Sequence, residues 1–178
     1  MSSVHADLVT VKRRQQAIVK LFLPLSRSRH VEVFMRKSPN EVAFGLGQSS
    51  PELRKSRHPT RRQNVFINYY EVWRTEGAHE SFTLDKAYLH VHLANRDGTG
   101  DTEVLALHAD PHIEKNDSLS MYKRGPHLHF SSAKDSFNKS HVALCLTDVD
   151  RVCGSLSAFQ AALVLAVGLI NDEFIERM

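Results

Sequence analysis

Cysteine is scarce in this 178-residue chain: Cys145 and Cys153 are the only two, and they lack the CxxC spacing of redox and metal motifs. The N-terminal stretch MSSVHADLVTVKRRQQ lacks the apolar core of a secretory signal. Long hydrophobic runs are missing too, because the most apolar one, Ala161–Ile170, has about half the length that spans a bilayer. These absences predict a cytoplasmic protein with reduced thiols and no membrane partner.

The composition is that of a globular protein, with 42% hydrophobic and 24% charged residues. These values exclude a disordered or fibrous chain. The length fits one domain whose core is large enough to fold without disulfides or metals. We therefore expect a single α+β domain over residues 1–178.

Charge is distributed unevenly along the chain. Residues 1–75 hold 14 Lys and Arg against 5 Asp and Glu, a net charge of +9, whereas residues 76–178 hold 9 against 15, a net charge of −6. Such an excess is typical of a surface that meets a polyanion or an acidic protein. Residues 49–63 are basic and nearly devoid of apolar side chains, which predicts a mobile loop that orders on such a partner. Its candidate nucleic-acid-binding residues are Arg54, Lys55, Arg57, Arg61 and Arg62.

Apolar periodicity predicts the secondary structure. It favours helices over residues 6–23 and 155–177, and strands over residues 31–35, 42–46, 65–74, 86–94, 103–108, 126–130 and 141–146. The DGTG sequence at 97–100 predicts a hairpin between two of these strands. We expect an antiparallel β-sheet with the C-terminal helix packed on one face and an N-terminal helix or arm.

Histidine is abundant, with eleven residues, and its spacing within the strands is informative. Side chains alternate between the two faces of a strand, so AYLHVHL puts His90 and His92 on one face and its aliphatic residues on the other. PHLHF does the same with His127 and His129. His108 and His141 lie near the edge of the same expected face, although the 103–108 strand is ambiguous. The pattern predicts one aliphatic sheet face and one histidine-bearing face.

Two chemistries use such a cluster. In metal-free phosphodiester cleavage, one imidazole takes a proton from a ribose 2′-hydroxyl and another gives a proton to the leaving oxygen. Nearby cations then offset the charge on phosphorus, and Lys123 and Arg124 are placed for that role. Alternatively, three imidazoles, or two and a carboxylate, bind zinc, with Asp97 and Asp110 as the nearest carboxylates.

The motifs from Tyr88 to Phe130 follow a recognisable order. A strand pair, YLHVHLANRDGTGDTEVLAL, precedes the loop HADPH, which contains Asp110 and His112, and then GPHLHF. This stretch resembles the TumE-type toxins of bacterial toxin–antitoxin systems, although the loop is two residues tighter than in that family. Those toxins are regarded as RNases, so the resemblance implies RNA cleavage, and a toxin of this kind would have a cognate antitoxin as partner.

Three hypotheses follow. The first is an RNase-like toxin or effector that needs no cofactor, with His127 and His129 as the leading acid–base pair and Asp110, His112, His90 and His92 in support. The second is a non-catalytic subunit of a bacterial defence complex that binds nucleic acid or an acidic protein through the basic half. The third is a zinc-dependent hydrolase.

Overall fold

A computed structural model describes residues 4–47, 55–75, 81–109, 127–130, 140–143 and 154–177 of the chain, with the backbone alone for 127–130 and 140–143. The helical elements are α1 (Leu8–Phe22), the 3₁₀ turn η1 (Leu23–Leu25), α3 (Leu156–Ile170) and the π-helical turn η3 (Asn171–Glu176). The strands are β1 (His5–Asp7), β2 (Val33–Ser38), β3 (Glu41–Leu46), β4 (His58–Pro59), β5 (Val65–Thr75), β6 (Ser81–Ala94), β7 (Asp101–Ala109), β8 (His127–Phe130) and β9 (Ser140–Ala143).

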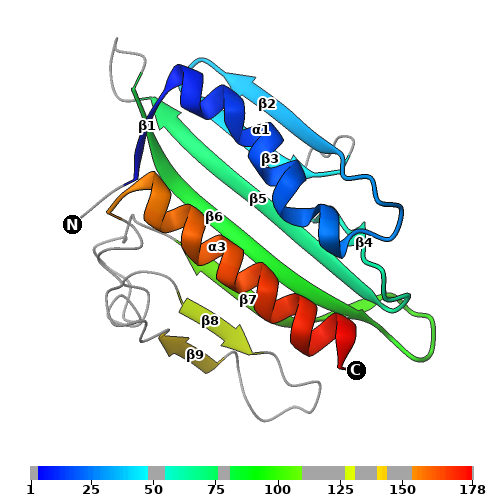
Figure 1. Ribbon diagram of the computed structural model, residues 1–178. Coiled ribbons are helices and arrows are strands. Elements are labelled where there is room, and N and C mark those ends of the chain that lie inside the picture. The colour runs from blue at the N-terminus through cyan, green and yellow to red at the C-terminus, as the bar shows by residue number, and fades with distance from the viewer. Residues whose placement is uncertain are drawn as a thin grey trace.

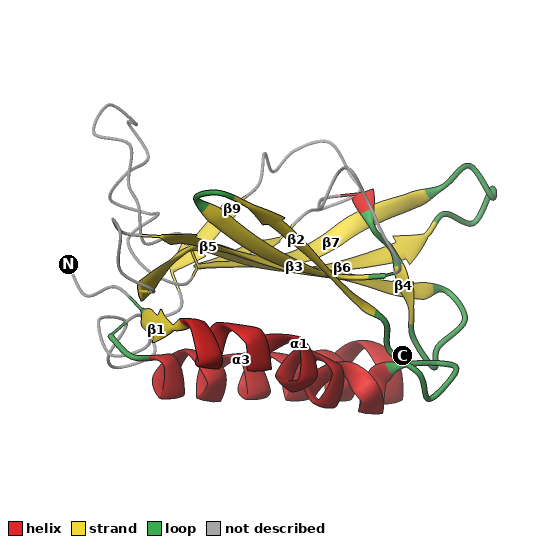
Figure 2. Ribbon diagram, turned by 90° about the horizontal axis from the view of Figure 1, so that it is seen from above, coloured by secondary structure: helices red, strands yellow, loops and turns green. Residues whose placement is uncertain are grey.

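The strands form one antiparallel sheet in the order β2-β3-β5-β6-β7-β8-β9, with the short β1 and β4 added beside β6 and β5 (Figure 1). Both helices lie on the same side of this sheet, and they run side by side across it (Figure 2). The expected α+β class is confirmed, together with the C-terminal helix on one face and an N-terminal helix. The strand boundaries move by a few residues from those expected, as is usual for element ends.

Helix α1 begins where the sequence supplies a cap. The Asp7 side chain accepts a hydrogen bond of 2.7 Å from the backbone N–H of Thr10, which satisfies one of the free donors of the first turn. Val11, Ile18 and Phe22 recur at helical spacing and are buried against the sheet. The chain then tightens into η1 at Pro24, so the helix ends where proline predicts.

Helix α3 is capped by Ser155, whose hydroxyl accepts from the N–H of Ala158 at 3.2 Å. Phe159, Leu163, Val167 and Ile170 are its buried residues, and they form one stripe toward the sheet. With η3 it forms a helix of 21 residues that is long and apolar enough to cross a membrane by length and composition, longer than the apolar run in the sequence indicates. Core helices of soluble proteins pass the same test, although they are mostly buried, whereas 28% of the apolar window is buried here. The structure is compatible with a soluble protein in which the buried stripe packs on the sheet.

A buried carboxylate lies at the centre of the helix-covered side. Tyr69, Glu71 and Trp73 alternate along β5 toward the helices, and the Glu71 side chain is fully buried. Its two oxygens accept four hydrogen bonds: from Arg14 Nε and Nη2 at 2.9 and 2.7 Å, from Tyr69 Oη at 2.6 Å and from Trp73 Nε1 at 3.0 Å. The Arg14 guanidinium also lies over the Phe159 ring, 5.7 Å from its centroid. Arg14 of α1 thus contacts both β5, through Glu71, and α3, through Phe159.

The Arg14–Glu71 ion pair is expected to stabilise the fold only while both partners are present. Burial opposes the charge on Arg14, but the Glu71 carboxylate more than compensates and raises the pKa of Arg14 above its usual value. Glu71→Gln or Arg14→Met should each lower the free energy of unfolding by about 3–5 kcal/mol, because each leaves a buried charge without its counter-ion. Urea denaturation measures this effect.

The double variant Arg14→Met/Glu71→Gln should cost less than the sum of the two single variants, since it leaves neither charge behind. Glu41→Gln, which breaks the exposed Arg36–Glu41 pair, serves as the control and should cost less than about 1 kcal/mol. Equal effects for the buried and the exposed pair would contradict the assignment.

Candidate active site on the histidine face

The sheet face opposite the helices carries the histidines, as the alternation predicts. On β6, Tyr88, His90 and His92 share this face, and the His90 and His92 rings lie parallel with their centroids 6.0 Å apart. The aliphatic residues between them, Leu89 and Val91, are buried in the core under the helices. The two expected faces of this strand are therefore confirmed. We call the side that carries His90 and His92 the histidine face.

The neighbouring strand β7 adds His108 to the same face, which resolves its ambiguous pattern. The ring of His108 lies 4.2 Å from that of Tyr88 and 5.2 Å from that of His90, centroid to centroid. Tyr70 on β5 packs edge-on against Tyr88, with ring centroids 5.0 Å apart. Three imidazoles and two phenol rings thus form a continuous layer across β5, β6 and β7.

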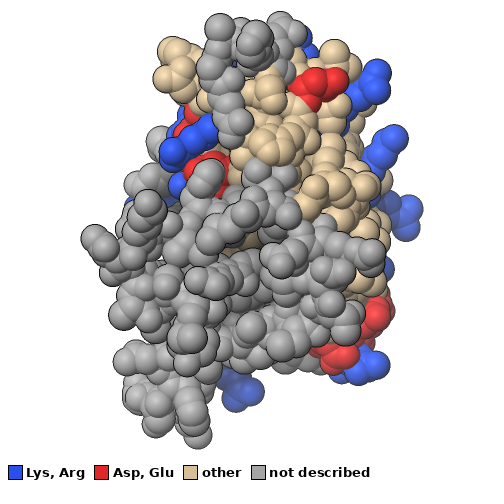
Figure 3. Space-filling model, turned by 90° about the vertical axis from the view of Figure 1, so that its left-hand side faces the viewer, with Lys and Arg blue, Asp and Glu red and all other residues tan. Residues whose placement is uncertain are grey.

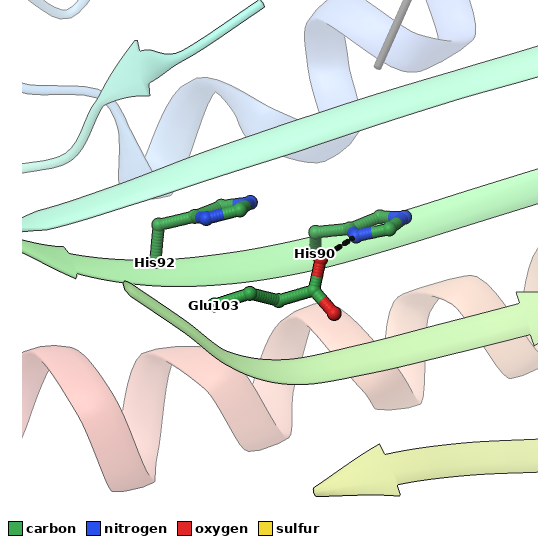
Figure 4. Close-up of side chains that lie close together, drawn as sticks. All are labelled: His90, His92 and Glu103. Carbon is green, nitrogen blue, oxygen red and sulfur yellow. Dashed lines mark hydrogen bonds and ion pairs between the residues drawn. The ribbon is translucent and has the colours of Figure 1, made fainter. Parts of the chain in front are cut away.

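Glu103 completes the cluster, and strict alternation along the strand would have placed it on the opposite face. His90 Nδ1 lies 2.7 Å from Glu103 Oε2, and His92 lies beside them on β6 (Figure 4). The reason is a β-bulge: Val91 pairs with Leu105, but His92 pairs with Glu103, so Val104 is an extra residue in β7. The bulge reverses the alternation and turns Glu103 from the aliphatic side to the histidines.

His92 is the most deeply buried histidine of the group, with 3% of its surface exposed. Its Nδ1 lies 3.0 Å from Asp101 Oδ1, close enough for an ion pair but without the geometry of a hydrogen bond. Burial, followed by the positive charge of Arg57, lowers the pKa of His92 despite the opposing carboxylates of Asp101 and Glu103. This imidazole is consequently neutral at pH 7.

The described part of the basic segment, residues 55–63, runs along the end of β5 and contacts the rest of the chain. Arg57 Nε lies 3.1 Å from Asp101 Oδ2, which brings a cation to the His92 end of the histidine face. Arg61 binds Asn171 and Glu176 after α3, and Arg62 binds Asn64. His58 and Thr60 are buried, so this part has polar anchors that its composition does not reveal. Mobility of the 49–63 loop stays a prediction.

Several predicted residues lie outside the described residues: Arg54, Asp110, His112, Lys123 and Arg124. Lys55 is described and is the first residue of the described part of the basic segment.

His127 and His129 are placed by the register of β8. His127 pairs with His108, and His129 pairs with Ala106, which itself pairs with His90. The backbone positions of both histidines are therefore cross-strand neighbours, through β7, of the strand positions that carry the described cluster.

A divalent metal would find three donors here. One ring nitrogen each of His90 and His92 and one oxygen of Glu103 lie within 4.8 Å of one another. Glu103, and not the expected Asp97, is the carboxylate of this group; the Asp97 carboxylate accepts hydrogen bonds from Thr99 in the β6–β7 turn. The sequence places Glu103 in a histidine-rich hairpin, but it does not reveal the bulge that decides on which face of the sheet the Glu103 side chain lies.

Comparison with known proteins gives no relative from which a role can be transferred. No protein-family model matches the chain, and neither a curated protein nor a solved structure shows significant similarity to it. The resemblance to the TumE-type toxins thus stays a prediction, and the site has to be interpreted from its own geometry.

Buried neutral histidines should make the stability of the fold depend on pH. Burial lowers the pKa of His58, which lies 3.0 Å from Ser26 Oγ through its Nε2, below the ordinary value of 6.5. Below that value the unfolded chain takes up a proton that the folded chain does not, so the free energy of unfolding should fall as the pH drops. Urea denaturation at pH 7.5 and 5.5 measures the decrease.

His58→Gln should make this decrease smaller, because the variant removes one of the groups that take up protons on unfolding. His5→Gln is the matched control, since His5 is exposed and does not act on His58, and it should keep the wild-type pH dependence. A His58→Gln variant with an unchanged decrease between the two pH values would show that this histidine does not cause it.

Proposed function

We propose that the protein is an RNase-like effector that cleaves RNA phosphodiester bonds on the histidine face. The observation that supports this function best is the packing of His90, His92 and His108 with Glu103 on one sheet face, beside the backbone positions of His127 and His129. Imidazoles titrate near neutral pH, so a group of them can contain both a proton acceptor and a proton donor.

The reaction needs two proton transfers and a positive charge. A neutral imidazole removes the proton of the 2′-hydroxyl as its oxygen attacks phosphorus. The bond to the 5′-oxygen then breaks, and a protonated imidazole gives that oxygen its proton, which leaves a 2′,3′-cyclic phosphate and a 5′-hydroxyl. His127 and His129 are the leading pair in this proposal. Lys123 and Arg124, together with Arg57 beside His92, would stabilise the negative charge.

His90 is suited to a supporting role in that chemistry. Its contact with Glu103 fixes the ring orientation and, with Nδ1 as donor, leaves Nε2 as an acceptor. His90 Nε2 is buried and has no hydrogen-bond partner among the described residues. A buried acceptor of this kind is what a substrate hydroxyl or a bound group would satisfy.

Cleavage of a defined RNA oligonucleotide tests the proposal. The double variant His127→Ala/His129→Ala should cleave at least about 100-fold more slowly than the wild type, because general acid–base groups contribute on that scale. The control variant His30→Ala changes an exposed histidine far from β8 in the sequence, and it should cleave the RNA at the wild-type rate. The products should carry 2′,3′-cyclic phosphates, and the same sequence in DNA should stay intact.

Two results would remove the proposal: no cleavage of cellular or synthetic RNA by the wild type, or equal cleavage by the double variant. Expression in a bacterial host adds an independent measurement. The wild type should slow growth and shorten cellular RNA, whereas the double variant should do neither.

A second candidate function, binding of an acidic protein segment, is favoured by the outer side of the helices. A groove of about 590 Å³ runs between α1 and α3, lined mainly by apolar residues that include Ala17, Leu21, Leu163 and Val164. Val164 of α3, which lines the groove, is 58% exposed. An apolar groove of this kind between helices fits the apolar face of an added helix.

The charge of the same surface indicates the partner's chemistry. The sequence of α1 contains four basic residues and no acidic one, and that of α3 contains no charged residue. Lys12, Arg13 and Lys20 of α1 are exposed. Figure 3 shows basic side chains gathered along one edge of the molecule. We therefore propose an acidic amphipathic helix, such as an antitoxin would supply, as the occupant.

A synthetic helical peptide with leucine on one face and glutamate on the other should bind to this groove. Val164→Glu should weaken the binding by at least about tenfold, because it puts a like charge beside the peptide, and its exposed position spares the fold. Fluorescence anisotropy measures the affinity. Binding to anionic lipid vesicles but not to the peptide, or equal affinity in the variant, would contradict this proposal.

A further inference from the structure

We infer that His90, His92 and Glu103 form a binding site for one divalent transition-metal ion of the zinc class. This inference deepens the proposed function, and the ion's role in RNA cleavage rests on that function. The binding of the ion to these three residues rests on geometry alone. The three residues come from two paired strands, β6 and β7, and they lie close together toward the turn that joins these strands (Figure 4).

The distances between the donors fit a small ion. One donor atom from each residue lies within 4.8 Å of the other two. Zinc bonds to imidazole nitrogen and carboxylate oxygen are about 2.0–2.2 Å long, so tetrahedral ligands lie roughly 3.4 Å apart. Changes in side-chain torsion that bring the most distant donors up to about 1.4 Å closer together would therefore close the site.

A buried, unpartnered histidine points to a missing ligand. Only 3% of the His92 surface is exposed, yet its Nε2 has no hydrogen-bond partner in the part of the chain that the structure describes. Nε2 of His90 also has no hydrogen-bond partner among the described residues, and the His90 ring lies parallel to that of His92. Leaving a buried polar atom unsatisfied destabilises the fold, and coordination of an ion would remove that penalty.

The donor set selects the class of metal. Two imidazoles and one carboxylate suit zinc and its neighbours, whereas magnesium and calcium prefer oxygen ligands throughout. The chain supplies three ligands from the described residues, which is the number that catalytic zinc sites use, with a further position for water or substrate. An ion at this place would bind a phosphate oxygen and take up part of the charge that develops on phosphorus.

Calorimetric titration of chelator-treated protein with zinc tests the inference without any RNA. We expect one ion per chain, and cobalt should give the visible absorption of a four-coordinate ion. His92→Ala should weaken zinc binding by at least about 100-fold, and Glu103→Gln by about tenfold, since each removes one ligand. His30→Ala disrupts the exposed His30–Glu32 pair and should leave the affinity unchanged.

Glu103→Gln keeps the test valid if His92→Ala does not fold, because the Glu103 side chain is 29% exposed and outside the core. Zinc binding that is absent, or equally tight in Glu103→Gln, would overturn the site. RNA cleavage that persists at full rate after chelation would overturn the metal's role but leave the proposed function standing. One tightly bound ion without RNA cleavage would confirm the metal site and remove the proposed function.

Discussion

The buried Glu71 carboxylate is the constraint on which the arrangement of the helices depends. A charge inside the core is tolerated only when its counter-ion and hydrogen-bond donors are all in place. Arg14 must therefore approach β5 from α1, and its guanidinium in turn lies over Phe159 of α3. Apolar packing alone would allow the helices to slide along the sheet, whereas the four hydrogen bonds to Glu71 are satisfied in one position.

Fixing the helices on one side leaves the other side of the same strands for polar chemistry. Within β5, Glu71 faces the helices while Tyr70, one residue away, packs on Tyr88 of the histidine face. The middle strands, β5 and β6, bury residues on both faces, so the His92 imidazole lies in a low-dielectric environment rather than in water. The site thus uses the rigidity of the sheet, and its side chains are positioned by strand register.

The sequence was sufficient for the class of fold and for the shared face of His90 and His92, because alternation is a local property of strands. It was not sufficient for Glu71 or Glu103. The ion pair of Glu71 joins residues 57 positions apart, and no local pattern encodes such a contact. Glu103 was missed because strict alternation fails at the bulge. The basic segment was read by composition, which does not show that Arg57 and Arg61 lie beside acidic residues of the same chain.

The bulge at Val104 makes the composition of the site depend on strand register as well as on residue type. Every position of β7 before it is out of phase with the positions after it, so pairing of Val104 with His92 would return Glu103 to the aliphatic side. Deletion of Val104 would instead leave Glu103 opposite His92 in a regular ladder. A descendant of this chain could therefore lose its carboxylate through a one-residue slip of β7 while retaining every residue by which the site would be recognised.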